Sequence, residues 1–243
     1  MKTVDSLERI KLISVEAHIA EQDSLMSDQF RKLRSVLNIH YMANDLRSIL
    51  VTSYAPDEGK TTVSLNLSAA LAKSPDTSVI LIDADVRKKS TSARLGLEDN
   101  PGLSEILDDK ADFEEVMVQT EIEGLNILPA GNDSANSVEL TSSIRMKDLL
   151  QQLRHRYQNS YIIIDSAPLI VASETTAISH IVDGVIIVIM ADSTRRDVVK
   201  REIESTNKRK IVGVVLNAAD FETSYHYQDY YRKYYKKETN WPT

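Results

Sequence analysis

The chain has 243 residues, which suits one α/β domain or at most two small domains. Apolar residues make up 42% of the sequence, enough for a core, and this excludes a disordered chain. The formal net charge of -7 and the isoelectric point near 5.3 argue against a nucleic-acid-binding protein, because neutralising phosphates needs a basic face. Cysteine is absent, which excludes disulfides and thiolate chemistry.

From the sequence we expect neither a signal peptide nor a membrane span. No apolar run approaches the ~18 residues that a span requires. Residues 1–23 are polar and mixed, with charges throughout, unlike a signal peptide. We interpret them as an N-terminal arm and expect a cytoplasmic protein that reaches the membrane only through a partner.

A helix is predicted to begin at Ser24 or Ser27 and to run to about Tyr41. Its apolar positions recur at helical spacing; they are Met26, Phe30, Leu33 and Leu37. Another side of the same helix carries Asp28, Arg31 and Arg34. From spacing alone, an ion pair within the helix on a solvated face is as good an interpretation as a functional one.

Residues 48–62 contain an apolar strand-like run, a turn and the start of a helical pattern. In that order, the sequence G-K-T is typical of a phosphate-binding loop, whose backbone N–H groups favour an anion. We expect Lys60 to lie along the β- and γ-phosphates and Thr61 to ligate Mg²⁺. The usual first glycine of the motif is replaced by Tyr54, so an ordinary turn before an amphipathic helix is the alternative.

Strands and helices alternate along the rest of the chain. A buried helical stripe follows the loop, formed by Val63, Leu67, Ala70 and Leu71. Strands are predicted at 78–83, 125–128, 161–165, 184–190 and 211–216, and helices at 103–107, 145–157 and 194–206. This alternation predicts an α/β fold, a doubly wound, mostly parallel sheet with helices on both faces.

Acidic residues end two of these strands. Asp83 ends SVILID and is followed by Asp85 and Arg87, and Asp165 ends YIIID in a Walker B arrangement. Ligands of open α/β sheets bind beyond the carboxyl ends of the strands. We therefore expect Asp165 to hold Mg²⁺, and Asp83 and Asp85 to divide metal binding and proton acceptance between them. The alternative for each acid is a cap on the following helix.

Three motifs, APDEGKTT, ILIDADVR and IIIDSAP, resemble the Walker A, Walker A′ and Walker B motifs of the bacterial tyrosine kinases (BY-kinases). These are the cytoplasmic kinases of capsule and exopolysaccharide assembly, P-loop NTPases related to the MinD/ParA ATPases. The resemblance covers roughly residues 24–243. It departs at Ala167, where the family's Walker B has a proline. Ala55 stands where MinD/ParA ATPases carry an extra lysine, and this favours the kinase.

The motifs and the resemblance together imply an ATP:protein-tyrosine phosphotransferase that uses ATP and Mg²⁺. The expected catalytic residues are Lys60, Asp83 and Asp85, with Asp85 as the base. The expected metal ligands are Thr61, Asp83 and Asp165. The expected ATP-binding residues are Pro56, Asp57, Glu58, Gly59, Lys60, Thr61, Thr62 and Arg87.

The resemblance also implies partners. Asp28, Arg31 and Arg34 stand where the family has E-x-x-R-x-x-R, the contact between subunits of a ring, so a homo-oligomer is expected. An activating transmembrane polysaccharide co-polymerase or chain-length regulator is implied, as is a cognate tyrosine phosphatase. The kinase domain would span residues 24–220.

Residues 221–243 form a tyrosine-rich tail. The expected phosphoacceptors are Tyr225, Tyr227, Tyr230, Tyr231, Tyr234 and Tyr235. Their helical spacing, interleaved with Lys and Arg, is also compatible with an amphipathic membrane-surface helix, and a solubilising end is a third possibility. The alternative function is a MinD/ParA-like assembly ATPase that hydrolyses ATP at the membrane without tyrosine kinase activity.

Overall fold

The computed structural model describes residues 19, 25–132, 139, 141, 144–191, 194–195, 197–198, 200 and 208–219. Of the N-terminal arm predicted at 1–23, only residue 19 is among them. The helix predicted at 194–206 is described only in part. The tyrosine-rich tail predicted at 221–243 lies outside the described residues.

A seven-stranded sheet forms the centre of the molecule, in the order β3-β4-β2-β5-β1-β6-β7. The strands are β1 (Ser48–Ser53), β2 (Ser78–Asp83), β3 (Val118–Gln119), β4 (Leu125–Leu128), β5 (Ser160–Asp165), β6 (Gly184–Met190) and β7 (Ile211–Asn217). Neighbouring strands are parallel except β3, which pairs antiparallel with β4. The predicted mostly parallel sheet is confirmed, and the short edge strand β3 is an addition that its two residues were too few to predict.

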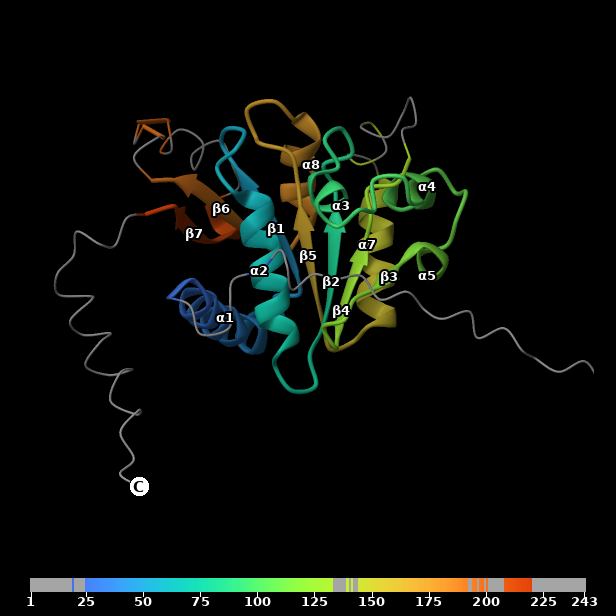
Figure 1. Ribbon diagram of the computed structural model, residues 1–243, viewed down its shortest axis with the longest axis horizontal. Coiled ribbons are helices and arrows are strands. Elements are labelled where there is room, and N and C mark those ends of the chain that lie inside the picture. The colour runs from blue at the N-terminus through green and yellow to red at the C-terminus, as the bar shows by residue number, and fades with distance from the viewer. Residues whose placement is uncertain are drawn as a thin grey trace, which may run out of the picture.

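Helices cover both faces of the sheet, as predicted (Figure 1). They are α1 (Leu25–Asn44), α2 (Lys60–Ala72), α3 (Ser90–Arg94), α4 (Leu103–Leu107), α5 (Phe113–Val116), α7 (Ile144–Arg156) and α8 (Ser173–Ile181), with a short 3₁₀ turn, η2 (Lys208–Lys210). One core cluster joins α1 and α2 to the sheet, and the other joins α4, α7 and α8 to its opposite face. Strands between two apolar layers are buried on both sides, which explains their unbroken apolar sequences.

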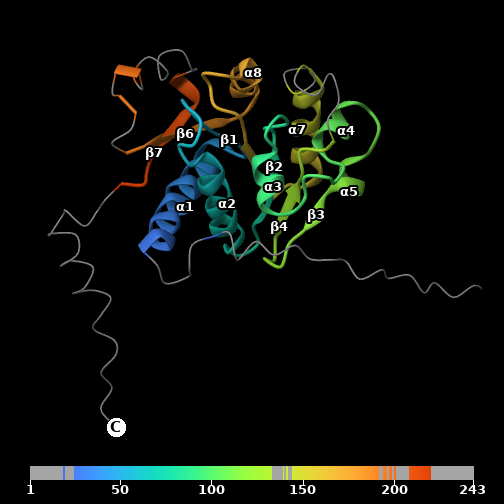
Figure 2. The same ribbon diagram turned by 45° about the horizontal axis from the view of Figure 1, so that its top comes forward.

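Helix α1 lies alongside α2 (Figure 2), which is therefore enclosed between α1 and the sheet. Phe30 and Leu37 are buried in this contact, whereas Met26, in the first turn of α1, is 38% exposed. The guanidinium of Arg34 donates a hydrogen bond of 3.0 Å to the carbonyl of Ala70, in the last turn of α2. Asp28 forms an ion pair with an arginine of its own helix, but it is buried and not on a solvated face.

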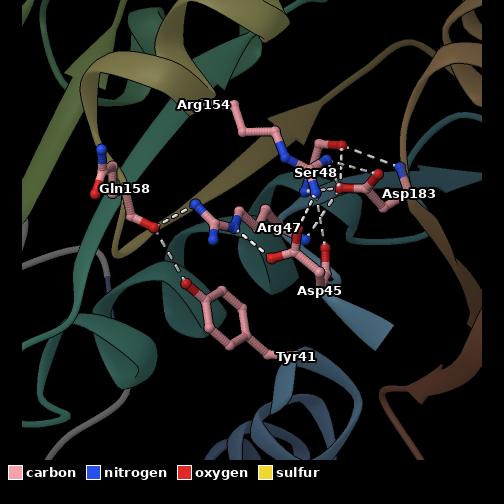
Figure 3. Close-up of polar contacts among 7 residues, drawn as sticks. All are labelled: Tyr41, Asp45, Arg47, Ser48, Arg154, Gln158 and Asp183. Atoms are coloured by element: carbon pink, nitrogen blue, oxygen red, sulfur yellow. Dashed lines mark hydrogen bonds and ion pairs between the residues drawn. The ribbon is translucent and has the colours of Figure 1, made fainter. Parts of the chain in front are cut away.

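A polar network lies at the amino edge of the sheet, where β1 begins (Figure 3). Asp183, before β6, accepts hydrogen bonds from the backbone N–H groups of Arg47 (3.0 Å) and Ser48 (2.8 Å) at the start of β1. Arg154 of α7 bridges Asp183 (3.0 Å) and Asp45 (2.5 Å). Burial alone would raise the pKa of Asp183, but these hydrogen bonds lower it below its usual value. The network fixes the start of β1, whose other end leads into the predicted phosphate loop.

Candidate active site

The predicted phosphate loop connects β1 to α2 in the expected order. Two of its residues have left-handed backbones, Asp57 with φ 61° and Gly59 with φ 90°. The carbonyl of Gly59 accepts the N–H of Val63 at 3.0 Å, so the helix begins at Lys60. The first N–H groups of a helix have no partner inside it, and together with the helix dipole they favour an anion in front of α2.

Gly59 is required for a second reason. A Cβ atom at this position would lie 1.9 Å from the side-chain nitrogen of Asn217, at the end of β7. That nitrogen donates a hydrogen bond of 2.9 Å to the carbonyl of Glu58. The peptide that precedes Gly59 is therefore held from β7, which the sequence did not reveal because the two residues lie far apart in the chain.

Glu58, predicted among the ATP-binding residues, uses its carboxylate to bind the backbone of its own loop and the end of β6. The carboxylate is buried and accepts hydrogen bonds from the N–H of Ala55 (2.9 Å), the N–H of Met190 (3.5 Å) and the hydroxyl of Thr194. These contacts hold the loop against the end of β6. Because the carboxylate is engaged in this way, we expect Glu58 to bind phosphate through its backbone.

The two acids at the strand ends are neighbours. Asp83 and Asp165 are register partners in the parallel pair of β2 and β5. Asp165 accepts hydrogen bonds from the hydroxyls of Thr91 (2.7 Å) and Ser64 (3.2 Å), and both carboxylates are fully buried. Asp83 accepts the N–H (2.8 Å) and the hydroxyl (2.7 Å) of Ser92. The sequence predicted the acids but not their hydroxyl partners, although Thr91 and Ser92 follow the DADVR motif closely.

Burial and mutual repulsion weaken the acidity of this pair. Burial, with the nearby charge of Asp165, raises the pKa of Asp83 to about 7. Burial also raises the pKa of Asp165. The hydrogen bond from Thr91, the charge of Lys60 and a hydrogen bond with Thr61 each lower this pKa, but burial outweighs them. Lys60 and Thr61 therefore lie beside Asp165, so the loop and the two strand ends meet at one place. Two buried carboxylates side by side are an arrangement that a cation relieves.

The remaining Walker A′ residues, Asp85 and Arg87, follow β2. Asp85 is 2% exposed, and its carboxylate accepts the N–H of Lys88 at 3.2 Å and the hydroxyl of Ser90 at 3.5 Å. The side chain of Arg87 is 62% exposed and lies 3.5 Å from the carboxylate of Glu174. Both residues therefore lie near the carboxyl edge of the sheet, where the arrows of β2 and β5 end in Figure 1.

The residues at this edge fit Mg²⁺. This ion keeps several waters and takes one or two carboxylates together with phosphate oxygens, so it does not need a protein cage. Thr61, Asp83 and Asp165 offer a hydroxyl and two carboxylates of this kind. Among the described residues there is no group of three or more His, Cys, Asp or Glu side chains that could hold a metal ion.

A lysine-bearing loop at a helix N-terminus, with two strand-end carboxylates beside it, defines a P-loop nucleotide-binding protein. Two further contacts border the site without having been predicted. Arg94 of α3 donates a hydrogen bond of 2.9 Å to the hydroxyl of Thr62, and Ser64 of α2 donates to the carbonyl of Lys60 at 3.0 Å. The first contact joins the start of α2 to the segment that follows Asp83, and the second lies within the first turns of α2.

Comparisons with known proteins identify the family within this class. The model of an AAA domain matches residues 48–208. The tyrosine-protein kinase CpsD of Streptococcus pneumoniae is 33% identical over 205 residues, which cover 82% of this chain and 88% of CpsD. The crystal structure of the chimerical protein CapA2B2 superposes with a TM-score of 0.74 at 30% identity, covering 82% of this chain and 87% of that one.

The succinoglycan biosynthesis transport protein ExoP of Rhizobium meliloti is 29% identical over 230 residues, which cover 89% of this chain but only 29% of ExoP. The chain belongs to the family of bacterial tyrosine-protein kinases. The resemblance predicted from the three motifs is thereby confirmed. Within the described residues, no helix combines the length and the apolar character needed to cross a membrane.

Proposed function

We propose that the chain is an ATP:protein-tyrosine phosphotransferase that phosphorylates its own C-terminal tyrosine cluster in trans. The proposal rests on the way Lys60, Asp83 and Asp165 lie together. The carboxylates of Asp83 and Asp165 lie on neighbouring strand ends, and the charge of Lys60 acts on Asp165. A phosphate loop alone binds a nucleotide, whereas transferring its terminal phosphoryl group also needs a metal site and a proton acceptor.

The reaction is an in-line displacement at the γ-phosphorus of ATP. The phenol oxygen of a tyrosine forms the new P–O bond, and the bond to the β–γ bridging oxygen breaks to release ADP. The phenol proton passes to the carboxylate of Asp85, the proposed general base. Lys60 and the backbone N–H groups at the start of α2 stabilise the negative charge of the β- and γ-phosphates. The loop residues Pro56, Asp57, Gly59 and Thr62 complete the cradle.

Thr61, Asp83 and Asp165 would hold Mg²⁺, which neutralises charge on the β- and γ-oxygens when bound. Other side chains of the protein already hold two of these ligands in position. Hydrogen bonds from Ser92 to Asp83 and from Thr91 to Asp165 fix both carboxylates in place before any ligand arrives. Preorganised ligands of this sort lower the cost of assembling the site.

The proposed acceptors are the six tyrosines between 225 and 235, since a tail that follows the last strand can reach the site of a neighbouring subunit. Each phosphate adds about 1.5 to 2 negative charges at neutral pH, so several on one tail repel one another and the acidic chain. The neighbour would be a second copy in a ring that uses Asp28, Arg31 and Arg34. The buried Asp28 and the bond from Arg34 to α2 mean that such a contact would act directly on the helix that carries Lys60.

The proposed pathway is exopolysaccharide or capsule synthesis and export. ExoP is by name a biosynthesis transport protein, and this chain corresponds to less than a third of its length. We infer a transmembrane polysaccharide co-polymerase as the activating partner. It would hold this chain at the cytoplasmic side of the membrane, and a tyrosine phosphatase would reset the tail.

The experiment is incubation with Mg-ATP, with and without the cytoplasmic tail of such a partner, read by mass spectrometry at residues 225–235. Lys60→Met should abolish phosphotyrosine formation and leave the circular dichroism spectrum unchanged. Ser179→Ala, on α8, is the matched control and should retain full labelling. Retained labelling in Lys60→Met would contradict the assignment. Release of phosphate to water without phosphotyrosine would instead favour a nucleotide-switched assembly ATPase.

A further inference from the structure

Beside the active site lies a buried carboxylate of which only one oxygen has a polar partner. Glu174, in the first turn of α8, is 3% exposed. Its Oε1 atom lies 3.5 Å from Nε of Arg87. Its Oε2 atom is buried and has no hydrogen-bond partner among the described residues. Buried polar atoms are nearly always paired, and an unpaired charged oxygen is costly, so this one needs an explanation.

The surroundings hold Glu174 in a fixed place relative to the catalytic acids. The hydroxyl of the next residue, Thr175, donates a hydrogen bond of 2.9 Å to the carbonyl of Ala167, two residues beyond Asp165. The hydroxyl of Thr52 in β1 donates to the same carbonyl at 3.0 Å. The first turn of α8 is thereby fastened to the loop that follows Asp165. Helix N-termini also favour negative charge, which keeps a carboxylate at this position.

Arg87 approaches this carboxylate by one end of its guanidinium. The contact is made through Nε, the nitrogen nearest the backbone, while 62% of the side chain is exposed. A guanidinium has five N–H donors in a planar fork, and four of them belong to the two terminal nitrogens. Anchoring Nε against a buried carboxylate therefore sets the direction of the terminal nitrogens, which can then bind two oxygens of an anion.

We propose that Glu174 is a positioning residue of the phosphotransfer site, which anchors Arg87 so that its terminal nitrogens bind oxygens of the transferred phosphoryl group. The inference rests on the proposed function and adds a residue outside the three Walker motifs. The free Oε2 accepts a second N–H from the same guanidinium when Arg87 is drawn inward by the bound nucleotide. The contact between Nε and Oε1 therefore holds the guanidinium before binding, and the bound nucleotide adds the second hydrogen bond.

The physical reason is preorganisation. An exposed arginine loses side-chain freedom when it binds an anion, and part of that loss is removed if a fixed carboxylate already holds the guanidinium. Because charge spreads over the oxygens of the transferred group in the transition state, the anchored arginine stabilises that state more than bound ATP. Loss of Glu174 should therefore lower kcat much more than it raises the KM for ATP.

The test uses Glu174→Gln, which removes the charge at nearly constant volume, and Glu174→Asp, which keeps it. Kinetics of tail phosphorylation by the full chain with Mg-ATP should show a kcat about tenfold lower for Glu174→Gln, with the KM for ATP changed by less than about twofold. Glu174→Asp should recover part of the loss. Ser179→Ala, a buried polar change on the same helix, should have wild-type kinetics.

A double-mutant cycle separates positioning from a purely structural role. If Glu174 acts through Arg87, then Arg87→Ala/Glu174→Gln should be no slower than Arg87→Ala alone. A further tenfold loss in the double variant, or a Glu174→Gln loss that follows only a lower unfolding temperature, overturns the proposal. ATP hydrolysis is measured on the same variants. If the wild type releases phosphate to water and makes no phosphotyrosine, the kinase proposal fails, while non-additive hydrolysis rates would still support the role of Glu174.

Discussion

Asp83→Asn is expected to make the magnesium-free protein more stable at neutral and alkaline pH, although it should abolish phosphotransfer. The folded chain holds Asp83 beside Asp165 in a fully buried position, and burial raises the pKa of Asp83 from 3.8 to about 7. Between these two pH values the folded chain keeps a proton that the unfolded chain has lost. Stability therefore falls as the pH rises through this window, which is the reverse of the usual behaviour of an aspartate.

The expected gain in the free energy of unfolding follows from the size of the pKa shift of Asp83. Each pKa unit corresponds to about 1.4 kcal/mol, so ionising Asp83 in the folded chain costs on the order of 4 kcal/mol at most. Asparagine avoids this cost and keeps an oxygen for Ser92, but its NH₂ group would face the N–H of Asp85, which now donates to Asp83 at 3.2 Å. Losing that hydrogen bond costs about 1 kcal/mol. The net gain above neutral pH is about 3 kcal/mol, or roughly 6–12 °C in unfolding temperature.

The assay is urea unfolding of both proteins in EDTA, from about pH 4 to pH 8. The stability of Asp83→Asn relative to wild type should rise with pH and cross zero in the acid range. Asp183→Asn is the control with the opposite sign. Because hydrogen bonds lower the pKa of Asp183, it stabilises the fold above its unfolded pKa, and its variant should be destabilised at neutral pH but not in acid. An Asp83→Asn variant that is less stable than wild type at every pH would refute the reasoning.

Three further outcomes are expected. Gly59→Ala should abolish measurable binding of a fluorescent ATP analogue while leaving the fold, because its Cβ would displace Asn217 from the loop and because φ of 90° disfavours alanine. Ser92→Ala should lower the free energy of unfolding in denaturant by about 1–2 kcal/mol, because it removes a hydrogen bond to Asp83. Since that hydrogen bond favours the ionised carboxylate, the variant should also raise the pKa of Asp83, so stability should change at a higher pH than in the wild type. Tyr161→Phe should cost about 1 kcal/mol in the same assay, because its hydroxyl donates at 2.9 Å to an asparagine side chain of α1; no change would mean that this hydrogen bond does not contribute to holding α1.

The local sequence was a good guide to the elements that carry the site. The run SVILID predicted β2 with its exact bounds, and Leu125–Leu128 and Gly184–Met190 were likewise predicted as observed. Helix α8 was missed because its nine residues include several with weak helical preference, among them three threonine or serine residues in the first four. It became a helix through packing against the loop after Asp165, which no local pattern reports.

Glu58 shows how far the sequence alone predicts the contacts of a residue in the site. Its place inside APDEGKTT predicted contact with phosphate, yet its carboxylate is bound by Ala55, Met190 and Thr194. Two of these three partners lie more than 130 residues further along the chain. A motif specifies which residue types surround a ligand, but the direction of each side chain depends on neighbours that only the folded chain supplies.

By itself the sequence determined the layered α/β class, the loop with Lys60, and an acid at the end of each of two strands, because these follow from apolar runs and turn residues close together in the chain. It did not determine that Asp83 and Asp165 are register partners, because strand order is a property of the whole sheet and β2 and β5 are separated by two other strands in sequence. Only the tertiary structure decided this adjacency, and with it the raised pKa of Asp83, since burial and repulsion between two carboxylates exist only once the strands are paired.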